Sequence, residues 1–216
     1  MNFSEKKPEY KSSTKERLMA LTAYPSFLKL LDTKNKPYKG FLEWLLKDEL
    51  NLIRDDKLMP QIKDIAKVSG TDAQKIANYL KAIYDDIFEL NDKEPEKFMR
   101  DGQTLCTLYF KYVTHTAYFS LGLNRIPRIG EVIQFGFMRP KIMGTMFHVE
   151  RVEYFIADME QAISINLNSN EENLYLRLLL EKAYLNSDIS VMEEIEMKFN
   201  DSNKVKEKLV NMYQHL

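Results

Sequence analysis

The sequence predicts an α+β protein with an N-terminal helical domain, a small antiparallel β-barrel of five strands and a helical C-terminal tail. The spacing of apolar residues changes from a helical period to a period of two near residue 102, and the helical period resumes near residue 170. Hydrophobic residues make up 44% of the 216 residues, with only 7 Gly and 7 Pro, which is a globular composition. We therefore place the domains at residues 1–101, 102–169 and 170–216.

The N-terminal stretch has the pattern of a series of helices. The segment TKERLMALTAY leads to Pro25, which suits the first turn of a helix because proline has no amide hydrogen to lose. After the polar loop KNKPYK, the segment GFLEWLLKDELNLI repeats apolar residues at helical spacing. This apolar stripe contains Phe41, Trp44, Leu45, Leu50 and Ile53.

Five segments between residues 104 and 168 are rich in β-branched and aromatic residues and predict strands. The last segment alternates Ile163, Ile165 and Leu167 with polar residues, as expected of a strand with one buried face. Short strands in this number suit a small antiparallel barrel, and IPRIGEVIQF resembles the opening of SH3-like barrels. The segments are TLCTLYFKYV, TAYFSLGL, EVIQFGF, TMFHVERVEYFI and AISINLN.

The last part of the chain, from residue 171 onward, returns to a helical period and is acidic. The segments ENLYLRLLLEKAYL, VMEEIEMKF and VKEKLVNMYQHL predict short helices with leucine-rich faces. Short helices take most of their stability from tertiary packing. We therefore expect this tail to pack on the body of the protein or to mediate self-association.

Composition excludes several classes of protein. Thirty-one Lys+Arg against 32 Asp+Glu give a net charge of −1, so any binding to nucleic acid must be local. The single cysteine, Cys106, excludes an internal disulfide framework and a cysteine-rich zinc site. The sequence has no signal-peptide core and no run of the ~18 apolar residues needed to span a bilayer. We expect a cytoplasmic protein that does not associate with membranes and uses no metal or other cofactor.

The segment from Pro60 to Phe88, PQIKDIAKVSGTDAQKIANYLKAIYDDIF, carries the most specific pattern. The small side chain of Ala66 lets two helices cross closely, Gly70 permits a left-handed turn, and Ile76 packs between the two helices. Asp72 is a good N-cap for the second helix, because its carboxylate can accept amide hydrogens of the first turn. The inward side of the first helix would be Ile62, Ile65 and Ala66, and the buried stripe of the second would be Ile76, Tyr79, Leu80, Ile83 and Ile87.

In its Ile-Ala, Gly and Ile positions, IKDIAKVSGTDAQKIANYL resembles the helix-turn-helix of bacterial transcription regulators, notably the LacI-type head, over residues 60–81. The pattern departs at Thr71, where an aliphatic residue is common, and has no arginine on the outward face. The resemblance implies that the second helix enters the DNA major groove. Gln74 and Asn78 would then read adenine, and Lys75 and Lys81 would meet guanine or phosphate. Further phosphate contacts would come from Lys63, Lys67, Lys36 and Lys39.

Other interpretations of these features stay open. A helix, a glycine turn and a longer helix also form purely structural corners or protein-docking grooves. The aromatic residues of the β segments either fill the core or form an exposed surface that binds bases, a peptide or a protein partner. These residues are Tyr109, Phe110, Tyr112, Tyr118, Phe119, Phe135, Phe137, Phe147, Tyr154 and Phe155.

We predict sequence-dependent DNA binding without catalysis, as a bacterial-type transcriptional regulator or a mobile-element protein. The partner would be double-stranded DNA, bound by a homodimer, and a small-molecule effector remains open. The chain contains no Gly-rich phosphate loop, metal-spaced His pair or nucleophile elbow, so we do not expect an enzyme. The alternative is a protein-interaction adaptor that binds a peptide or partner through the aromatic surface of the β-barrel. The remaining possibility is an enzyme whose tyrosines and carboxylates are brought together only by folding.

Overall fold

The chain divides into two compact units, residues 1–170 and residues 171–216. Most of the predicted tail lies outside the described residues, as do Leu50 and Ile53 of the predicted helix after the polar loop. The helices and strands described below therefore all belong to the first unit. The computed structural model describes residues 10–47, 60–112, 115–158, 160–169, 182–183, 185–190 and 211–212.

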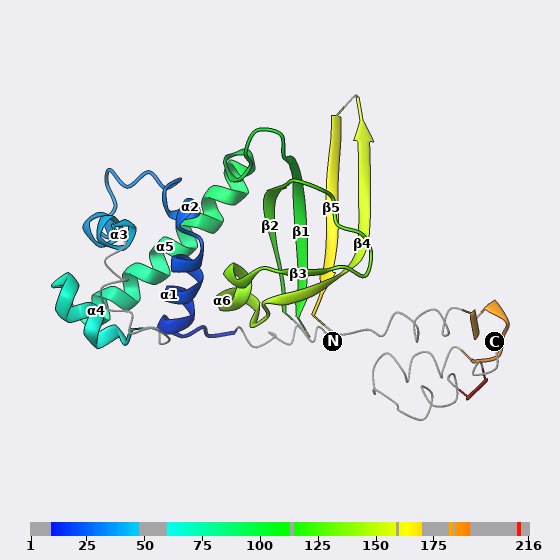
Figure 1. The fold of residues 1–216 in the computed structure, drawn as a ribbon, viewed down its shortest axis with the longest axis horizontal. Helices are drawn as coiled ribbons and strands as arrows, with labels where there is room; N and C mark the ends of the chain where they lie inside the picture. The colour runs from blue at the N-terminus through cyan, green and yellow to red at the C-terminus, as the bar shows by residue number, and fades with distance from the viewer. Residues whose placement is uncertain are drawn as a thin grey trace, which may run out of the picture. The chain divides into compact units, whose positions relative to one another are not determined.

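Helices form the first half of this unit, and they begin where the sequence supplies a cap (Figure 1). Ser13 and Glu16 form a reciprocal capping box at the start of the first helix, and Pro25 occupies the first position of the second. The longest helix, α5, has 21 residues and carries the chain from the helical half to the sheet. The elements are α1 (Thr14–Ala23), α2 (Pro25–Leu28), α3 (Lys39–Leu46), α4 (Ile62–Ser69), α5 (Ala73–Lys93) and the 3-10 turn η2 (Pro95–Phe98).

All five predicted strand segments contain a strand. The segment EVIQFGF departs most from its prediction, because the strand ends at Gln134 and the chain continues into a 3-10 turn. After this 3-10 turn, the chain forms one turn of α-helix over Arg139–Ile142. The elements are β1 (Thr104–Tyr112), β2 (His115–Leu123), β3 (Val132–Gln134), η3 (Gly136–Met138), α6 (Arg139–Ile142), β4 (Met146–Ala157) and β5 (Glu160–Asn168).

The strands form one curled sheet in the order β2-β1-β5-β4-β3, which is a half-barrel (Figure 1). The prediction of an all-antiparallel sheet is wrong, because β1 and β5 are parallel. The β1–β2 and β4–β5 hairpins are each antiparallel, and they meet with the first strand of one beside the second strand of the other. The order of strands is a long-range property that the alternation within each strand does not encode.

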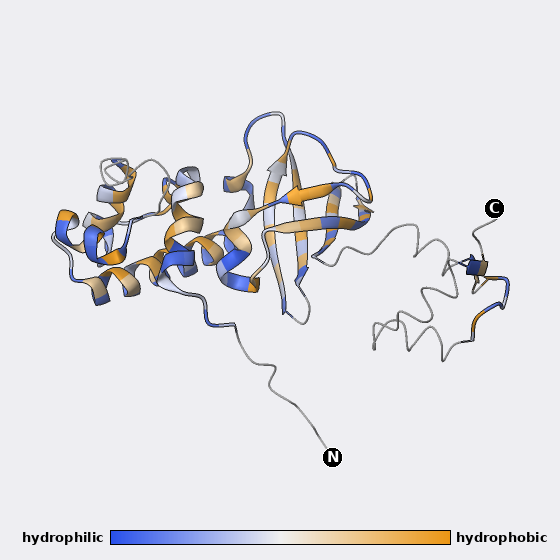
Figure 2. Cartoon of the chain, turned by 60° about the horizontal axis from the view of Figure 1, so that its bottom comes forward, coloured by the Kyte–Doolittle hydropathy of each residue, from blue (hydrophilic) through white to orange (hydrophobic). Residues whose placement is uncertain are grey.

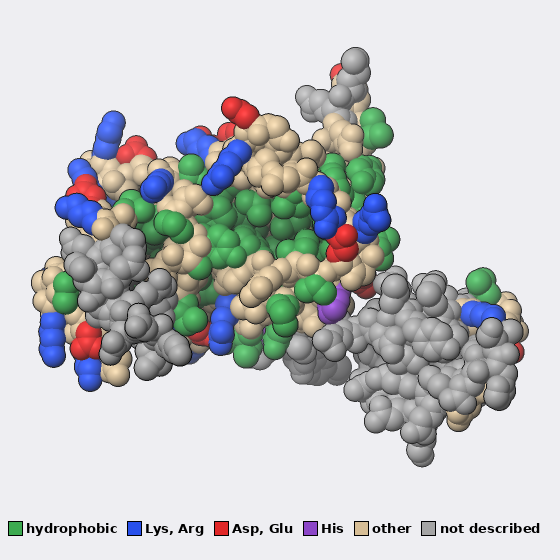
Figure 3. Space-filling view, viewed as in Figure 1, with side chains coloured by type: hydrophobic (Ala, Val, Ile, Leu, Met, Phe, Trp, Pro, Cys, Tyr) green, Lys and Arg blue, Asp and Glu red, His purple; other side chains and the backbone are tan. Residues whose placement is uncertain are grey.

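Helices and sheet share one hydrophobic core. Phe27 of α2 stacks on Phe119 of β2 with ring centroids 5.5 Å apart, and its ring edge meets Phe137 at 5.2 Å. Figure 2 shows hydrophobic residues recurring along both the helices and the strands of this unit. Figure 3 shows hydrophobic side chains gathered between the helices and the sheet. The change of period near residue 102 therefore marks a change of secondary structure within one compact unit.

Two polar contacts anchor the far end of α5 to the sheet. The carboxamide of Asn91 donates to the backbone oxygen of Ser120 at 2.7 Å and accepts from the backbone nitrogen of the same residue at 2.8 Å. About two helical turns earlier, the hydroxyl of Tyr84 donates to the backbone oxygen of Phe137 at 2.8 Å. Asn91 is only 3% exposed, so these contacts are shielded from water and fix the helix to the sheet.

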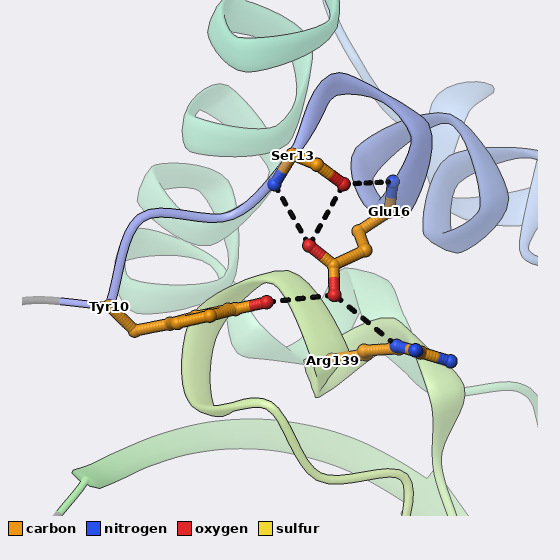
Figure 4. A network of polar contacts seen from close by, with 4 residues as sticks. All are labelled: Tyr10, Ser13, Glu16 and Arg139. Atoms are coloured by element: carbon orange, nitrogen blue, oxygen red, sulfur yellow. Dashed lines mark hydrogen bonds and ion pairs between the residues drawn. The ribbon is translucent and has the colours of Figure 1, made fainter.

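A polar network ties α1 to α6 (Figure 4). Glu16 accepts hydrogen bonds from the backbone nitrogen of Ser13 at 2.8 Å and from the hydroxyl of Tyr10 at 2.7 Å, and it pairs with Arg139 at 3.4 Å. Burial alone would raise the pKa of Glu16, but the bonds from Ser13, Tyr10 and Arg139 outweigh it and hold the pKa below its usual value. The network thereby joins the helical half to the short helix that leads into β4.

Candidate nucleic-acid interface

The α4–α5 corner consists of α4, the turn at 70–72 and the first nine residues of α5, Ala73–Lys81. Gly70 adopts φ +65°, the left-handed conformation that the spacing predicts. Asp72 caps α5 and accepts from the backbone nitrogens of Gln74 at 2.9 Å and Lys75 at 3.2 Å. Both local predictions are confirmed, and they fix the direction in which α5 leaves the turn.

Apolar residues hold the two helices of this corner together. Ile65 of α4 and Ile76 and Leu80 of α5 are fully buried. Ile62 and Ala66 are partly buried and pack against the same cluster. The inward face thus matches the predicted pattern, and the first turns of α5 rest on a packed base that keeps their outer face in one orientation.

The predicted reading residues of α5 are exposed. Gln74, Lys75, Asn78 and Lys81 all point into solvent, and the amide of Gln74 donates to the side-chain oxygen of Asn78 at 3.4 Å. At 3.6 residues per turn, positions 74, 78 and 81 form one stripe along the helix, whereas Lys75 lies about 100° to its side. The structure therefore brings two amides and one ammonium onto a single outward stripe.

The additional lysines differ in their surroundings. Lys63 and Lys67 are exposed and lie four residues apart on one face of α4, and Lys39 is exposed at the start of α3. Lys36 instead pairs with Asp86 of α5 at 2.7 Å, and Asp86 also accepts a hydrogen bond from Tyr38. The charge of Lys36 is thus already compensated inside the protein, a contact that sequence separation concealed.

Burial and the bond to Asp86 together raise the pKa of the Tyr38 phenol, which is therefore neutral at any physiological pH. Tyr38 is 1% exposed and holds the KNKPYK loop against the middle of α5. The KNKPYK loop is therefore fixed to α5 through Asp86, while the ammonium of Lys39 remains exposed.

The aromatic residues of the sheet divide between core and surface. Alternation along β1 buries Phe110 and exposes 45% of Tyr109, and the same rule in β2 buries Phe119 and exposes 47% of Tyr118. The half-barrel therefore fills its interior with phenylalanine and presents tyrosine outward. Phe135, Phe137 and Phe147 are buried, Tyr112 is partly buried, and Tyr154 and Phe155 are more than half exposed.

A cavity of about 730 Å³ lies where the end of α5 meets β1 and β2. Its lining includes Phe88 and Asp92 of α5, Tyr109 of β1, Tyr118 of β2 and Lys141 of α6. The hydrogen bond that Tyr118 donates to Asp92 raises the pKa of the phenol, and the Lys141 ammonium lies 5.2 Å from the centre of the Phe88 ring. Sequence reasoning missed this site because its residues come from separate segments.

Three further features bear on the kind of site that the protein could hold: its cysteine, its potential metal ligands and the length of its apolar helices. Burial raises the pKa of the Cys106 thiol, which suits an inert core residue rather than a nucleophile. The described part of the chain contains no group of three His, Cys, Asp or Glu side chains that could hold a metal ion. Within the same residues, no helix has the length and apolar character needed to cross a membrane.

Comparison with protein families, curated proteins and solved structures finds no match to this chain. The geometry of the corner, the cavity and the sheet therefore carries the functional argument.

Proposed function

We propose that this protein binds double-stranded DNA in a sequence-dependent manner, as a non-catalytic regulator or mobile-element protein, with the start of α5 in the major groove. The observation that carries the proposal is the outward stripe of Gln74, Asn78 and Lys81 above a fully buried Ile76 and Leu80. A helix that reads bases needs this combination, because its side chains must be free while its axis is held.

The chemistry of the stripe suits base edges. A carboxamide offers a donor and an acceptor together, which is the pattern that adenine presents in the major groove. The hydrogen bond between Gln74 and Asn78 is long and exposed, so it can be exchanged for bonds to a base with little loss. An ammonium such as that of Lys81 suits guanine or a phosphate oxygen.

The charge distribution requires local rather than general attraction. With a net charge of −1, the protein must meet phosphates through particular lysines, and Lys63, Lys67, Lys75 and Lys39 are exposed around the corner. Because Lys36 already pairs with Asp86, we expect it to contribute less than these four. Affinity should fall steeply as salt rises.

The decisive experiment is selection of bound sequences from random duplex DNA with the full chain. We expect a motif with adenines that is lost in the double variant Gln74→Ala, Asn78→Ala, since each bidentate pair contributes about 1–3 kcal/mol of discrimination. Gln134→Ala removes an exposed amide on β3 and serves as the matched control that keeps the motif. No enrichment with the unmodified protein would end the proposal.

A second measurement separates phosphate contacts from base contacts. Lys81→Ala should lower the slope of log affinity against log salt by about 1 if this ammonium meets a phosphate, and should alter the motif if it meets guanine. Lys93→Ala at the opposite end of α5 is the control, because Lys93 pairs with Glu89 and lies away from the corner. Equal effects of the two lysines would contradict a local interface.

A protein-interaction adaptor is the second candidate, and one observation favours it. The cavity beside α5 combines aromatic walls from Phe88, Tyr109 and Tyr118 with charged groups, which suits a peptide side chain. Selection from a random peptide library would test this function. A consensus peptide that loses affinity for Tyr118→Ala, but not for Gln74→Ala, would favour the adaptor over the DNA-binding protein.

A further inference from the structure

The end of the β4–β5 hairpin extends beyond the rest of the sheet (Figure 1). Strand β3 pairs with β4 only as far as His148, and β1 pairs with β5 only from Ser164 onward. Residues 151–157 of β4 therefore pair only with β5, and residues 160–163 of β5 pair only with β4. We call these two segments together the hairpin arm. A two-stranded ribbon has marginal stability by itself in water.

The hairpin arm carries large apolar side chains on both of its faces. Tyr154 lies opposite the buried Ile163, on the side of the sheet that continues from the core, and is 54% exposed. Ile156 is on the same side and is 77% exposed. Phe155 is on the other side, opposite Ala162, and is 56% exposed. The apolar face of the sheet thus continues past the helices that cover it elsewhere.

The charges of the hairpin arm do not suit nucleic acid or an anionic lipid surface. Arg151, its only cation, pairs with Glu153 at 3.4 Å, and Asp158 lies in the turn. A phosphate-rich partner would need unpaired cations beside these apolar groups. The chemistry of the arm instead fits another protein surface with exposed apolar side chains.

The free edge of β4 supplies such a surface in a second copy of the chain. This edge runs over residues 151–157 and is longer than the free edge of β5 at 160–163. Antiparallel pairing of β4 with its copy about a two-fold axis at Tyr154 would place Val152 opposite Ile156 of the second copy. Such a contact is isologous and closes at two copies.

We propose that the hairpin arm is a homodimer interface formed by antiparallel pairing of β4 with β4 of a second copy. The three exposed apolar side chains offer roughly 350 Å² per copy, nearly half of the ~800 Å² that each partner contributes to a typical interface. The paired backbone and neighbouring side chains would add to this area. The interface does not depend on DNA binding.

The test measures the mass of the full chain by sedimentation velocity over a concentration series. We expect a dimer for the unmodified protein and at least a 100-fold rise in the dimer dissociation constant for Ile156→Glu. Met146→Glu is the matched control, because Met146 is 60% exposed in the same strand but lies at its other end. The control should dimerise like the unmodified protein, and circular dichroism checks that both variants fold.

Cysteine cross-linking locates the interface directly. Single cysteines at positions 152 to 156 are oxidised in the full chain, and Cys106 does not interfere because it is fully buried. We expect a disulfide-linked dimer at one of these positions, since facing residues of antiparallel strands bring their Cβ atoms to about 5 Å. Met146→Cys should give none.

Three results would overturn the proposal. The first is a monomer throughout the concentration series. The second is a dimer that Ile156→Glu leaves intact and that no cysteine of the hairpin arm traps, which would place the contact elsewhere. The third is a dimer that disappears only when residues 171–216 are deleted. A monomeric Ile156→Glu variant that still selects the same DNA motif would support the dimer site and leave the DNA proposal intact.

Discussion

The α4–α5 corner and the hairpin arm both present side chains to solvent, but they differ in what lies beneath. At the corner, exposed amides and ammoniums stand above fully buried Ile76 and Leu80. In the hairpin arm, exposed Tyr154 and Ile156 have no packed layer over them among the described residues. A polar surface on a rigid base suits a charged partner that binds and leaves, whereas an apolar ribbon suits a lasting one.

Removing the anchor of α5 should destabilise the unit that carries both regions, and it is the largest effect that we expect from the loss of a polar contact. Asn91→Leu deprives the buried backbone groups of Ser120 of both partners, so the free energy of unfolding should fall by about 3 kcal/mol. Urea denaturation measures this change. Asn78→Ala, an exposed amide on the same helix, should change stability by less than about 0.5 kcal/mol, and equal losses would contradict the anchoring role.

A change at the turn of the corner should affect that region alone. Gly70→Ala places a Cβ on a residue with φ +65°, where the surrounding space is open and only the backbone conformation resists it. We expect a loss of about 1–2 kcal/mol in thermal or urea denaturation. Gly70→Asn should lose less, because asparagine tolerates the left-handed region better. Dimer mass should stay unchanged in both variants.

The polar network around Glu16 should make the link between α1 and α6 sensitive to acid. Because the pKa of Glu16 is held below its usual value in the folded protein, the carboxylate stabilises the fold at neutral pH and loses this contribution as pH falls through that pKa. Glu16→Gln should therefore cost about 1 kcal/mol at pH 7, and the two proteins should converge in acid as the pH falls through the lowered pKa of Glu16. A gap that widened in acid would contradict this sign.

The smallest effect should come from the hairpin arm itself. Phe155→Ser, measured at concentrations where the protein is a monomer, should change the free energy of unfolding by less than about 0.5 kcal/mol, because 56% of Phe155 is already exposed. Phe110→Ser in the buried face of β1 is the contrasting variant and should lose about 3 kcal/mol or more. A large loss at Phe155 would mean that the arm is packed within one chain.

Sequence reasoning predicted the features that depend on neighbouring residues. The left-handed Gly70, the cap at Asp72 and the buried Ile76 follow from steric and hydrogen-bonding rules that act over a few positions. The exposure of the corner's amides follows from the same helical period. Whether this corner is a helix-turn-helix that binds DNA stays a prediction.

Contacts between residues that are far apart in the sequence could not be predicted from local patterns. The parallel pairing of β1 with β5 joins segments about 57 residues apart, as in Thr107 with Ser164, and no alternation pattern reports it. The ion pair of Lys36 with Asp86 and the cavity beside Phe88 have the same origin. The division of the aromatic residues between core and surface could have been found, because strict alternation assigns phenylalanine and tyrosine of β1 and β2 to opposite faces.

The carboxamide of Asn91 has one more consequence. Its hydrogen bonds occupy both backbone groups of Ser120 at the outer edge of β2, so a strand from another sheet could not pair with β2 at this position. At the opposite edge of the sheet, β3 is only three residues long, so it offers few free backbone groups for pairing with an added strand. Among the described strands, β4 in the hairpin arm therefore offers the more open edge for strand addition, and pairing there about a two-fold axis gives a closed pair of molecules rather than a growing fibre.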